Sequence, residues 1–130
     1  MSSSGRTTPA AARVAAAASA VAPSTPTALN GVFSAAQAAR GAEQFRQACS
    51  TCHAIGDQAA SLRSKWGNGT LRDLFSVVST TMPQNNPGSL SPGDYASLVA
   101  YYLQQSGFQP GQSDLPADPV LLSRLRVPAP

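Results

Sequence analysis

Apolar positions follow a helical period in three segments of this 130-residue chain. The first segment starts at Ser34, and Gln37 stands three positions further on, which is the pattern of a capping box. The residues that follow recur every three or four positions and define one face of a helix that frays between residues 48 and 52. The apolar face of this predicted helix comprises Ala38, Gly41, Ala42, Phe45 and Cys49.

Two further helices are predicted after it. One begins near Thr70, has Asp73 in its first turn, and ends before Pro83, because a residue that precedes proline disfavours helix. The other has Ser91 as a capping hydroxyl and Gly107 as a left-handed stop. Its apolar stripe comprises Tyr95, Leu98, Val99, Tyr102 and Leu103. No segment shows sustained alternation of apolar and polar residues, so we predict an all-α fold.

The chain divides into three parts, residues 1–28, 29–109 and 110–130. The first is rich in Ala, Ser, Thr and Pro. It reads as an export signal, with Arg6 and Arg13 as its basic region, or as a disordered tail. Residues 29–109 hold the predicted domain, whose helical part runs roughly from residue 34 to residue 107. Residues 110–130 form an extended tail, in which Asp118 as a cap and Pro119 in the first turn indicate a short helix.

The charge pattern bears on one class of partner, nucleic acid. The net charge is +3, but without Arg6 and Arg13 the chain has seven basic against six acidic residues and no basic cluster. Nucleic-acid binding through a basic patch is therefore not supported.

No stretch of the sequence has the length and apolarity of a membrane-spanning helix. The helical part is short and holds few large apolar residues, so an additional core component would help it to fold.

The segment "ACSTCHA", residues 48–54, holds both cysteines and the only histidine of the chain. Structural zinc needs four ligands, and Cys49, Cys52 and His53 supply at most three. A thioredoxin-like dithiol pair opens a helix beside a sheet, whereas this pair closes a helix in a chain without strands. A disulfide between the two cysteines is a further alternative. We favour a fourth, in which the cysteines form thioethers to a haem and His53 binds its iron.

A covalently attached haem implies a further iron ligand elsewhere in the chain. An electron-transfer haem takes a sixth iron ligand, and with no second histidine a methionine thioether is the obvious one. Besides the initiator, the chain has only Met82, which lies 29 residues after His53. Taken alone, a methionine there is more simply a core residue at the end of a helix, but together with the cysteine motif we favour Met82 as the iron ligand. If Met82 does not bind, the iron is five-coordinate, and the protein binds a small gas or peroxide instead.

With these residues in place, the chain resembles the class I c-type cytochromes over about residues 34–107. "GAEQFRQACSTCH" (41–53) is similar to the N-terminal helix of that family, "TMP" (81–83) to its methionine loop, and "LVAYYL" (98–103) to its C-terminal helix. The resemblance implies a small fold of three main helices around one covalent haem c. It places Tyr101 near the helix-crossing Gly41. Phe45, Leu98 and Trp66 are candidates for packing on the haem. The indole N–H of Trp66 and the guanidinium of Arg72 would also suit its propionates, but we favour packing at least equally for Trp66 and a solvated helix position for Arg72.

The likeness is closer to small cytochromes that accompany periplasmic quinoprotein dehydrogenases, in residues 31–41, 66–71, 87–103 and 107–116. It implies a periplasmic electron carrier and not an enzyme, reduced by a dehydrogenase and oxidised by an oxidase or another cytochrome. One feature departs from the family. The segment 54–66 lacks the proline whose carbonyl accepts the ring N–H of the iron-binding histidine. Another carbonyl of this segment is expected to replace it behind His53.

Overall fold

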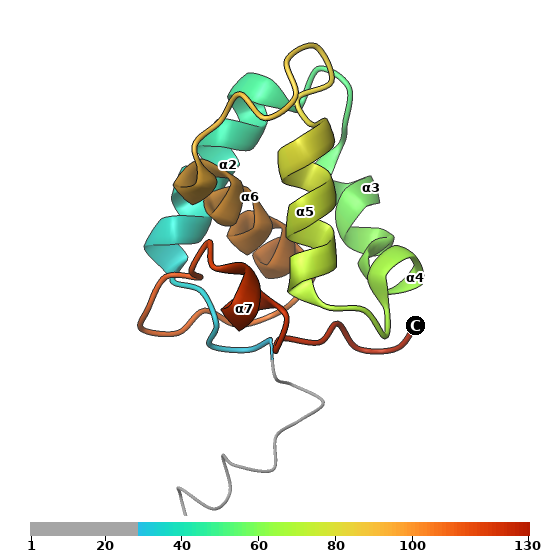
Figure 1. Cartoon of the computed structure of the whole chain (residues 1–130), viewed down its shortest axis with the longest axis vertical. Coiled ribbons are helices and arrows are strands. Elements are labelled where there is room, and N and C mark those ends of the chain that lie inside the picture. Colours follow the sequence, from blue (N-terminus) through green and yellow to red (C-terminus); the bar gives the residue numbers. More distant parts are fainter. Residues whose placement is uncertain (1–28) are drawn as a thin grey trace, which may run out of the picture.

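The structure, a computed structural model, describes residues 29–130. Residues 1–28, for which the sequence indicates an export signal or a disordered tail, lie outside the described part. Residues 29–130 form helices joined by loops, with no β-strand among them (Figure 1). The helices are α2 (Ala35–Ala48), α3 (Ile55–Ala60), α4 (Leu62–Trp66), α5 (Leu71–Thr81), α6 (Pro92–Gln105) and α7 (Pro119–Leu122). Within this part of the chain, no helix is long and apolar enough to cross a membrane.

The three main helices begin and end where the sequence predicts. The hydroxyl of Ser91 caps α6 by accepting from the N–H of Asp94, and Gly107 follows the helix with a positive φ of 99°. Helix α5 carries a complete capping box, in which Thr70 and Asp73 each accept from the other's backbone N–H. These local signals are strong because they satisfy backbone N–H groups that the helix itself leaves unpaired.

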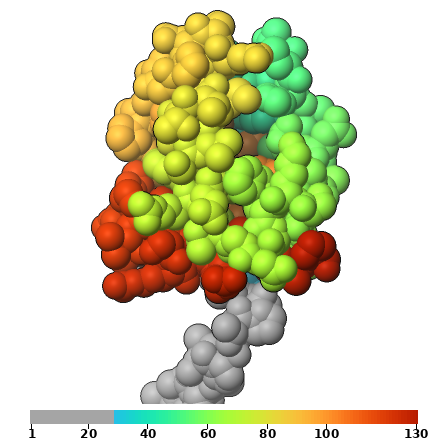
Figure 2. Space-filling view, turned by 45° about the vertical axis from the view of Figure 1, so that its right-hand side comes forward, coloured from blue at the N-terminus to red at the C-terminus, as the bar shows by residue number. Residues whose placement is uncertain are grey.

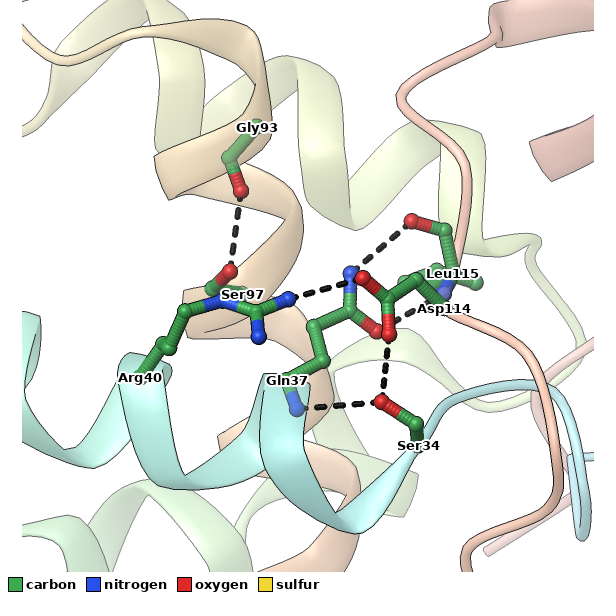
Figure 3. Close-up of polar contacts among 7 residues, drawn as sticks. All are labelled: Ser34, Gln37, Arg40, Gly93, Ser97, Asp114 and Leu115. Atoms are coloured by element: carbon green, nitrogen blue, oxygen red, sulfur yellow. Dashed lines mark hydrogen bonds and ion pairs between the residues drawn. The ribbon is translucent and has the colours of Figure 1, made fainter.

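The capping box predicted for α2 is only half present. Ser34 accepts a hydrogen bond from the N–H of Gln37 at 3.0 Å, as expected. The Gln37 side chain does not return to the backbone of Ser34, and instead binds the backbone of Leu115 in the C-terminal tail (Figure 3). Gln37 is buried at 3% exposure, so its amide is satisfied by the nearest backbone and not by its own helix.

The segment that follows the histidine is helical, which the sequence pattern does not indicate. Residues 54–66 form the short helices α3 and α4, and Ser61 is both the C-cap of the first and the N-cap of the second. Neither helix exceeds six residues, so neither spans enough turns to show a helical period. Leu62 is their only fully buried residue, and it anchors α4 in the core.

Helices α2 and α6 cross at close range (Figure 1). A Cβ at Gly41 would lie 1.9 Å from the carbonyl oxygen of Ser97, so only glycine allows this approach. Next to the crossing, the ring centroids of Phe45 and Tyr101 lie 5.8 Å apart. The position expected for Tyr101 near Gly41 is therefore confirmed. This crossing fixes the direction in which α2 delivers the residues at its C-terminal end.

The core extends beyond the three main helices at both ends. Besides the apolar stripes of those helices, it contains residues that precede α2 and residues of the tail after α6. The buried residues from these two segments are Leu29, Phe33, Phe108, Leu115, Leu122 and Val127. The tail carries the short helix α7, for which Asp118 accepts from the N–H of Val120 at 2.9 Å. The folded part is thus larger than the helical periodicity alone indicates.

The tail is held by hydrogen bonds to two regions of the domain. On one side, the carboxylate of Asp114 accepts from the Ser34 hydroxyl and from the Arg40 guanidinium (Figure 3). On the other, the N–H of Leu71 donates to the carbonyl of Leu125 at 2.8 Å. Residues 68, 69 and 127 add two more backbone bonds beside it. The tail therefore wraps the end of the molecule opposite the loop that joins α5 to α6 (Figure 1).

Candidate functional site

The Cys-x-x-Cys-His segment follows directly on the C-terminal end of α2. Cys49 is the C-cap of that helix, and its N–H donates to the carbonyl of Phe45 at 2.9 Å. The carbonyl of Cys49 then accepts from the N–H groups of Cys52, at 3.1 Å, and His53, at 2.9 Å. Because one tight turn contains all three residues, their backbone forms a single unit at the end of a well-packed helix.

The two thiols differ in environment, and no disulfide joins them. Cys49 is half-buried, and burial raises the pKa of its thiol, whereas Cys52 is exposed. A catalytic dithiol needs a lowered thiol pKa, which a helix N-terminus can supply. Cys49 has the opposite shift and stands at the C-terminal end of a helix, so its setting does not suit thioredoxin-like chemistry.

A cavity of about 810 Å³ opens beside this segment. The hollow lies between α5 with its following loop and the segment after α2, and α6 is visible at its floor (Figure 2). Its volume is near the upper end of the range of about 300–1,000 Å³ that is usual for small-molecule sites. It is lined by every residue that the sequence singles out for haem attachment, iron binding or haem packing, namely Phe45, Cys49, Cys52, His53, Trp66, Met82 and Leu98.

The interior of the cavity is mainly apolar. Helix α5 contributes Leu74 and Val78, and α6 contributes Leu98 and Val99. Toward the solvent, the lining residues are exposed and mostly uncharged, and Lys65 is the only one that carries a full charge at neutral pH. The arrangement suits a large, flat, apolar group with one edge at the surface.

Met82 is held in place by its backbone. Its N–H closes the last turn of α5 on the carbonyl of Val78 at 3.0 Å. Its carbonyl accepts from the hydroxyl of Tyr95 at 2.6 Å and from the N–H of Gly88 at 3.3 Å. The same hydroxyl accepts from the N–H of Leu90 at 3.4 Å. The sequence assigns Tyr95 only to the apolar stripe of α6, and no spacing rule reveals its bond to the methionine loop.

Beside the ring of His53 the structure places a side-chain amide, where the class I cytochromes that the chain resembles have the main-chain carbonyl of a proline. The Nδ1 atom of His53 lies 2.9 Å from the side-chain nitrogen of Gln58, which projects from α3. Both residues are half-buried and both line the cavity. The segment 54–66 thus provides a side-chain amide at this ring nitrogen, and no main-chain carbonyl is bonded to it in the described structure. The helical state of this segment explains the difference, because helix formation engages its main-chain carbonyls.

One residue that lines the cavity has a buried hydroxyl without a partner. Tyr102 is 8% exposed, lines the cavity, and has no hydrogen-bond partner for its hydroxyl within residues 29–130. Burial raises its pKa, and the nearby side chains of Ser61 and Trp66 oppose this without reaching hydrogen-bond geometry. Arg72, considered from the sequence as a partner for an acidic group, is exposed on α5 and does not line the cavity.

The donor set and the walls fit an iron porphyrin. Two sulfurs lie in one turn at the cavity, with an imidazole next to them and a thioether on a separate segment. Tyr102, one of the lining residues, also has a buried hydroxyl that finds no partner within residues 29–130. A structural zinc ion fits poorly, because the described residues contain no group of three or more His, Cys, Asp or Glu side chains arranged around a metal ion.

Comparison with known proteins agrees with this chemistry. No curated protein and no solved structure shows significant similarity to the chain. The sequence model of the family described as "Cytochrome C oxidase, cbb3-type, subunit III", a family of c-type cytochrome domains, matches residues 36–101. The match covers just over half of the chain and includes the Cys-x-x-Cys-His segment, Met82 and most of α6. The chain therefore belongs to this family, as a class I monohaem c-type cytochrome with covalently bound haem c.

Proposed function

We propose that this cytochrome is a one-electron carrier whose haem is attached through Cys49 and Cys52 and whose iron is bound by His53 and Met82. The observation that supports this proposal is the convergence of all four side chains on one cavity of about 810 Å³. When bound, haem c supplies a one-electron Fe(III)/Fe(II) couple, and a thioether ligand raises its potential.

The protein fixes both proposed axial ligands from rigid elements. His53 follows a turn that α2 anchors, and the backbone of Met82 makes hydrogen bonds to α5, to its own loop and to Tyr95 of α6. Electron transfer is fast when the ligands move little between oxidation states, and a rigid scaffold serves this requirement. The exposed residues around the cavity leave one edge accessible to partner proteins (Figure 2).

A gas-binding or peroxide-reducing function is less well supported. Peroxide chemistry needs an acid–base residue beside the open face of the iron. Among the described residues that line the cavity there is no carboxylate, and the only imidazole is that of His53. If His53 binds the iron, no second histidine exists in the chain for proton transfer.

We further propose a periplasmic location and a dehydrogenase as the electron donor. The support is the resemblance of residues 31–41, 66–71, 87–103 and 107–116 to cytochromes of periplasmic dehydrogenases. That resemblance also implies attachment of haem on the periplasmic side. The acceptor is an oxidase or another cytochrome, and the family description itself names an oxidase subunit. Docking is expected to be transient, through a small interface over the cavity rim.

The test is the absorption spectrum of the full chain after expression with a haem-attachment system. Sharp c-type bands on reduction and a weak near-infrared sulfur-to-iron band in the oxidised protein are expected. Met82→Ala should abolish the near-infrared band while haem stays attached. Val77→Ala, which shortens another cavity-lining side chain, should keep it. Attached haem without the sulfur band in the wild type would contradict the His53/Met82 assignment.

The donor is tested separately with the same holoprotein. A periplasmic quinoprotein dehydrogenase and its alcohol substrate should reduce the haem at a rate that rises with dehydrogenase concentration. The control omits the alcohol. Failure of several such dehydrogenases to reduce a chemically reducible haem would contradict the proposed donor and leave the electron-carrier function intact.

A further inference from the structure

We propose that the side chain of Gln58 positions His53 and helps to set the redox potential of the haem. This inference depends on the proposed function, because it takes His53 as an iron ligand. It assigns to a glutamine side chain of residues 54–66 the role that a proline carbonyl has in the class I cytochromes that the chain resembles.

The geometry places the terminal amide of Gln58 beside Nδ1 of the imidazole. The Nδ1 atom of His53 lies 2.9 Å from the terminal amide of Gln58, well within hydrogen-bond range. Gln58 stands in α3, a helix that packs against α6, so its backbone is held by tertiary contacts. Both side chains are half-buried at the cavity. A bond in this position is shielded from competing water more than a surface contact would be.

The chemistry requires a particular orientation of the amide. If Nε2 of His53 binds the iron, Nδ1 carries a proton and must donate it to an acceptor. The amide oxygen and nitrogen of glutamine exchange places by a half-turn of the terminal amide, and their assignment follows from the hydrogen bonds around them. Within residues 29–130, the Gln58 side chain has no other hydrogen bond that would oppose this half-turn. With metal-bound His53, the Oε1 atom of Gln58 therefore accepts from Nδ1.

This bond affects the iron through the imidazole. An acceptor on Nδ1–H draws the proton away from the ring, which makes the ring more electron-rich and the histidine a stronger ligand. A stronger donor ligand stabilises Fe(III) relative to Fe(II), so the potential falls as the acceptor becomes stronger. Removing the acceptor should raise the potential, and replacing the amide by a carboxylate should lower it.

The experiment measures the midpoint potential of the holoprotein by spectroelectrochemistry. Gln58→Leu should shift the potential upward and Gln58→Glu downward. Gln47 provides a matched control, because it also lines the cavity but has no hydrogen bond to His53 in the described structure. Gln47→Leu should have little effect, and Gln47→Glu should reproduce only the part of the downward shift that comes from an added negative charge.

A second readout follows the proton itself. In the reduced wild type, NMR should show the Nδ1–H proton of His53 exchanging slowly with water, and Gln58→Leu should speed that exchange. A purely structural role would not move the potential in opposite directions for the leucine and glutamate variants. Shifts at Gln58 no larger than those at Gln47, or unchanged proton exchange, would overturn the proposal.

The same spectra separate this failure from failure of the proposed function. Haem-shifted signals from His53 and Met82 in the reduced wild type establish the two axial ligands independently of Gln58. If those signals are present while the Gln58 variants behave like the Gln47 controls, only the positioning role is wrong. If the wild type lacks haem-shifted His53 signals, both the axial assignment and the Gln58 proposal are wrong.

Discussion

The side chain of Gln37 and the backbone of Leu115 form two hydrogen bonds to each other across 78 residues of sequence. The amide nitrogen of Gln37 donates to the carbonyl of Leu115 at 2.9 Å, and the N–H of Leu115 donates to the amide oxygen of Gln37 at 2.7 Å. Both bonds are buried, and they join α2 to the tail (Figure 3). The helix that ends in the proposed haem-attachment segment is thereby joined to a part of the chain outside the family match.

Loss of this pair should destabilise the protein. Gln37→Ala leaves a buried N–H and a buried carbonyl of Leu115 without partners, which costs about 1–3 kcal/mol for each group. We expect the free energy of unfolding of the holoprotein in denaturant to fall by roughly 2–6 kcal/mol. Gln44→Ala, on the same helix but without such a bond in the described structure, should change it by less than about 0.5 kcal/mol. Equal effects of the two variants would contradict this account of Gln37.

The crossing of α2 and α6 predicts a contrast between two glycines. Gly41→Ala would place a methyl group 1.9 Å from the carbonyl oxygen of Ser97, so the helices must separate. The expected loss of unfolding free energy is at least about 3 kcal/mol, as for severe overpacking. At Gly56 in α3 a Cβ would meet nothing within 4 Å. Gly56→Ala should therefore stabilise by up to about 1 kcal/mol through helix propensity. Thermal unfolding of both variants provides the check.

On the proposal that Met82 binds the iron, Tyr95 should control how firmly that bond is held. Tyr95→Phe removes the 2.6 Å bond to the carbonyl of Met82 and the weaker bond from the N–H of Leu90. A loss of about 0.5–1.5 kcal/mol of loop stability would make external ligands bind roughly 2–13-fold more tightly. Titration of the oxidised protein with imidazole or cyanide measures this. Tyr101→Phe, whose ring packs on Phe45, should leave the affinity unchanged.

Acid should loosen the tail through Asp114. The hydroxyl of Ser34, followed by the guanidinium of Arg40, holds the pKa of Asp114 below its ordinary value of 3.8. A lowered pKa in the folded state stabilises the protein above the unfolded-state pKa, and this stabilisation is lost as pH falls through the folded-state pKa. The stability difference between wild type and Asp114→Asn should therefore shrink as pH is lowered below about 3.8. Arg40→Gln should show a smaller stability difference from the wild type with the same dependence on pH. A difference that is constant with pH would contradict this linkage.

Electron exchange with partners should depend little on salt. Of the described residues that line the cavity, only Lys65 carries a full charge, and the exposed others include Gln84, Asn85 and Asn86. Raising the ionic strength from 0.01 to 0.1 M shortens the Debye length from about 30 to about 10 Å and weakens steering by charges. The second-order rate constant for reduction by an anionic donor protein should change little across this range.

A charged variant provides the contrast for that experiment. Replacing Gln84 and Asn86 together by lysine should raise the low-salt rate with an anionic donor and make it fall steeply with salt. If the wild type already shows a steep fall, charges remote from the cavity rim direct the encounter, and the expected weak dependence on salt is wrong.

The sequence predicts those parts of the protein that depend on local signals. The caps at Ser34, Thr70 and Ser91 locate the helices, because capping satisfies backbone groups within a few residues. The motif that contains Cys49, Cys52 and His53 can be predicted because covalent haem attachment needs these residues close together in the chain. The family match supports the fold and the cofactor, and the roles of the individual side chains in haem binding stay predictions.

The remaining features depend on contacts that no local pattern encodes. The N–H of Gln37 makes the first bond of the capping box with Ser34, yet the side-chain amide of Gln37 pairs with the backbone of Leu115, 78 residues further on. Gln58 lies behind His53 only because residues 54–66 fold into two short helices. Tyr95 has the spacing of a core residue, and its hydroxyl donates to the carbonyl of Met82, 13 residues earlier in the chain. In each case the partner is chosen by tertiary packing.

The wrapped tail also determines what can be moved from this protein into another. Residues 36–101 carry both cysteines, His53 and Met82, but the buried side chains of Leu115, Leu122 and Val127 lie beyond them. A chimera that contains only this span would keep every residue proposed to contact the haem. It would lose the tail residues that complete the core beside α2 and α5. Such a graft should attach haem and yet hold its ligands loosely, unless the recipient supplies an equivalent of the tail.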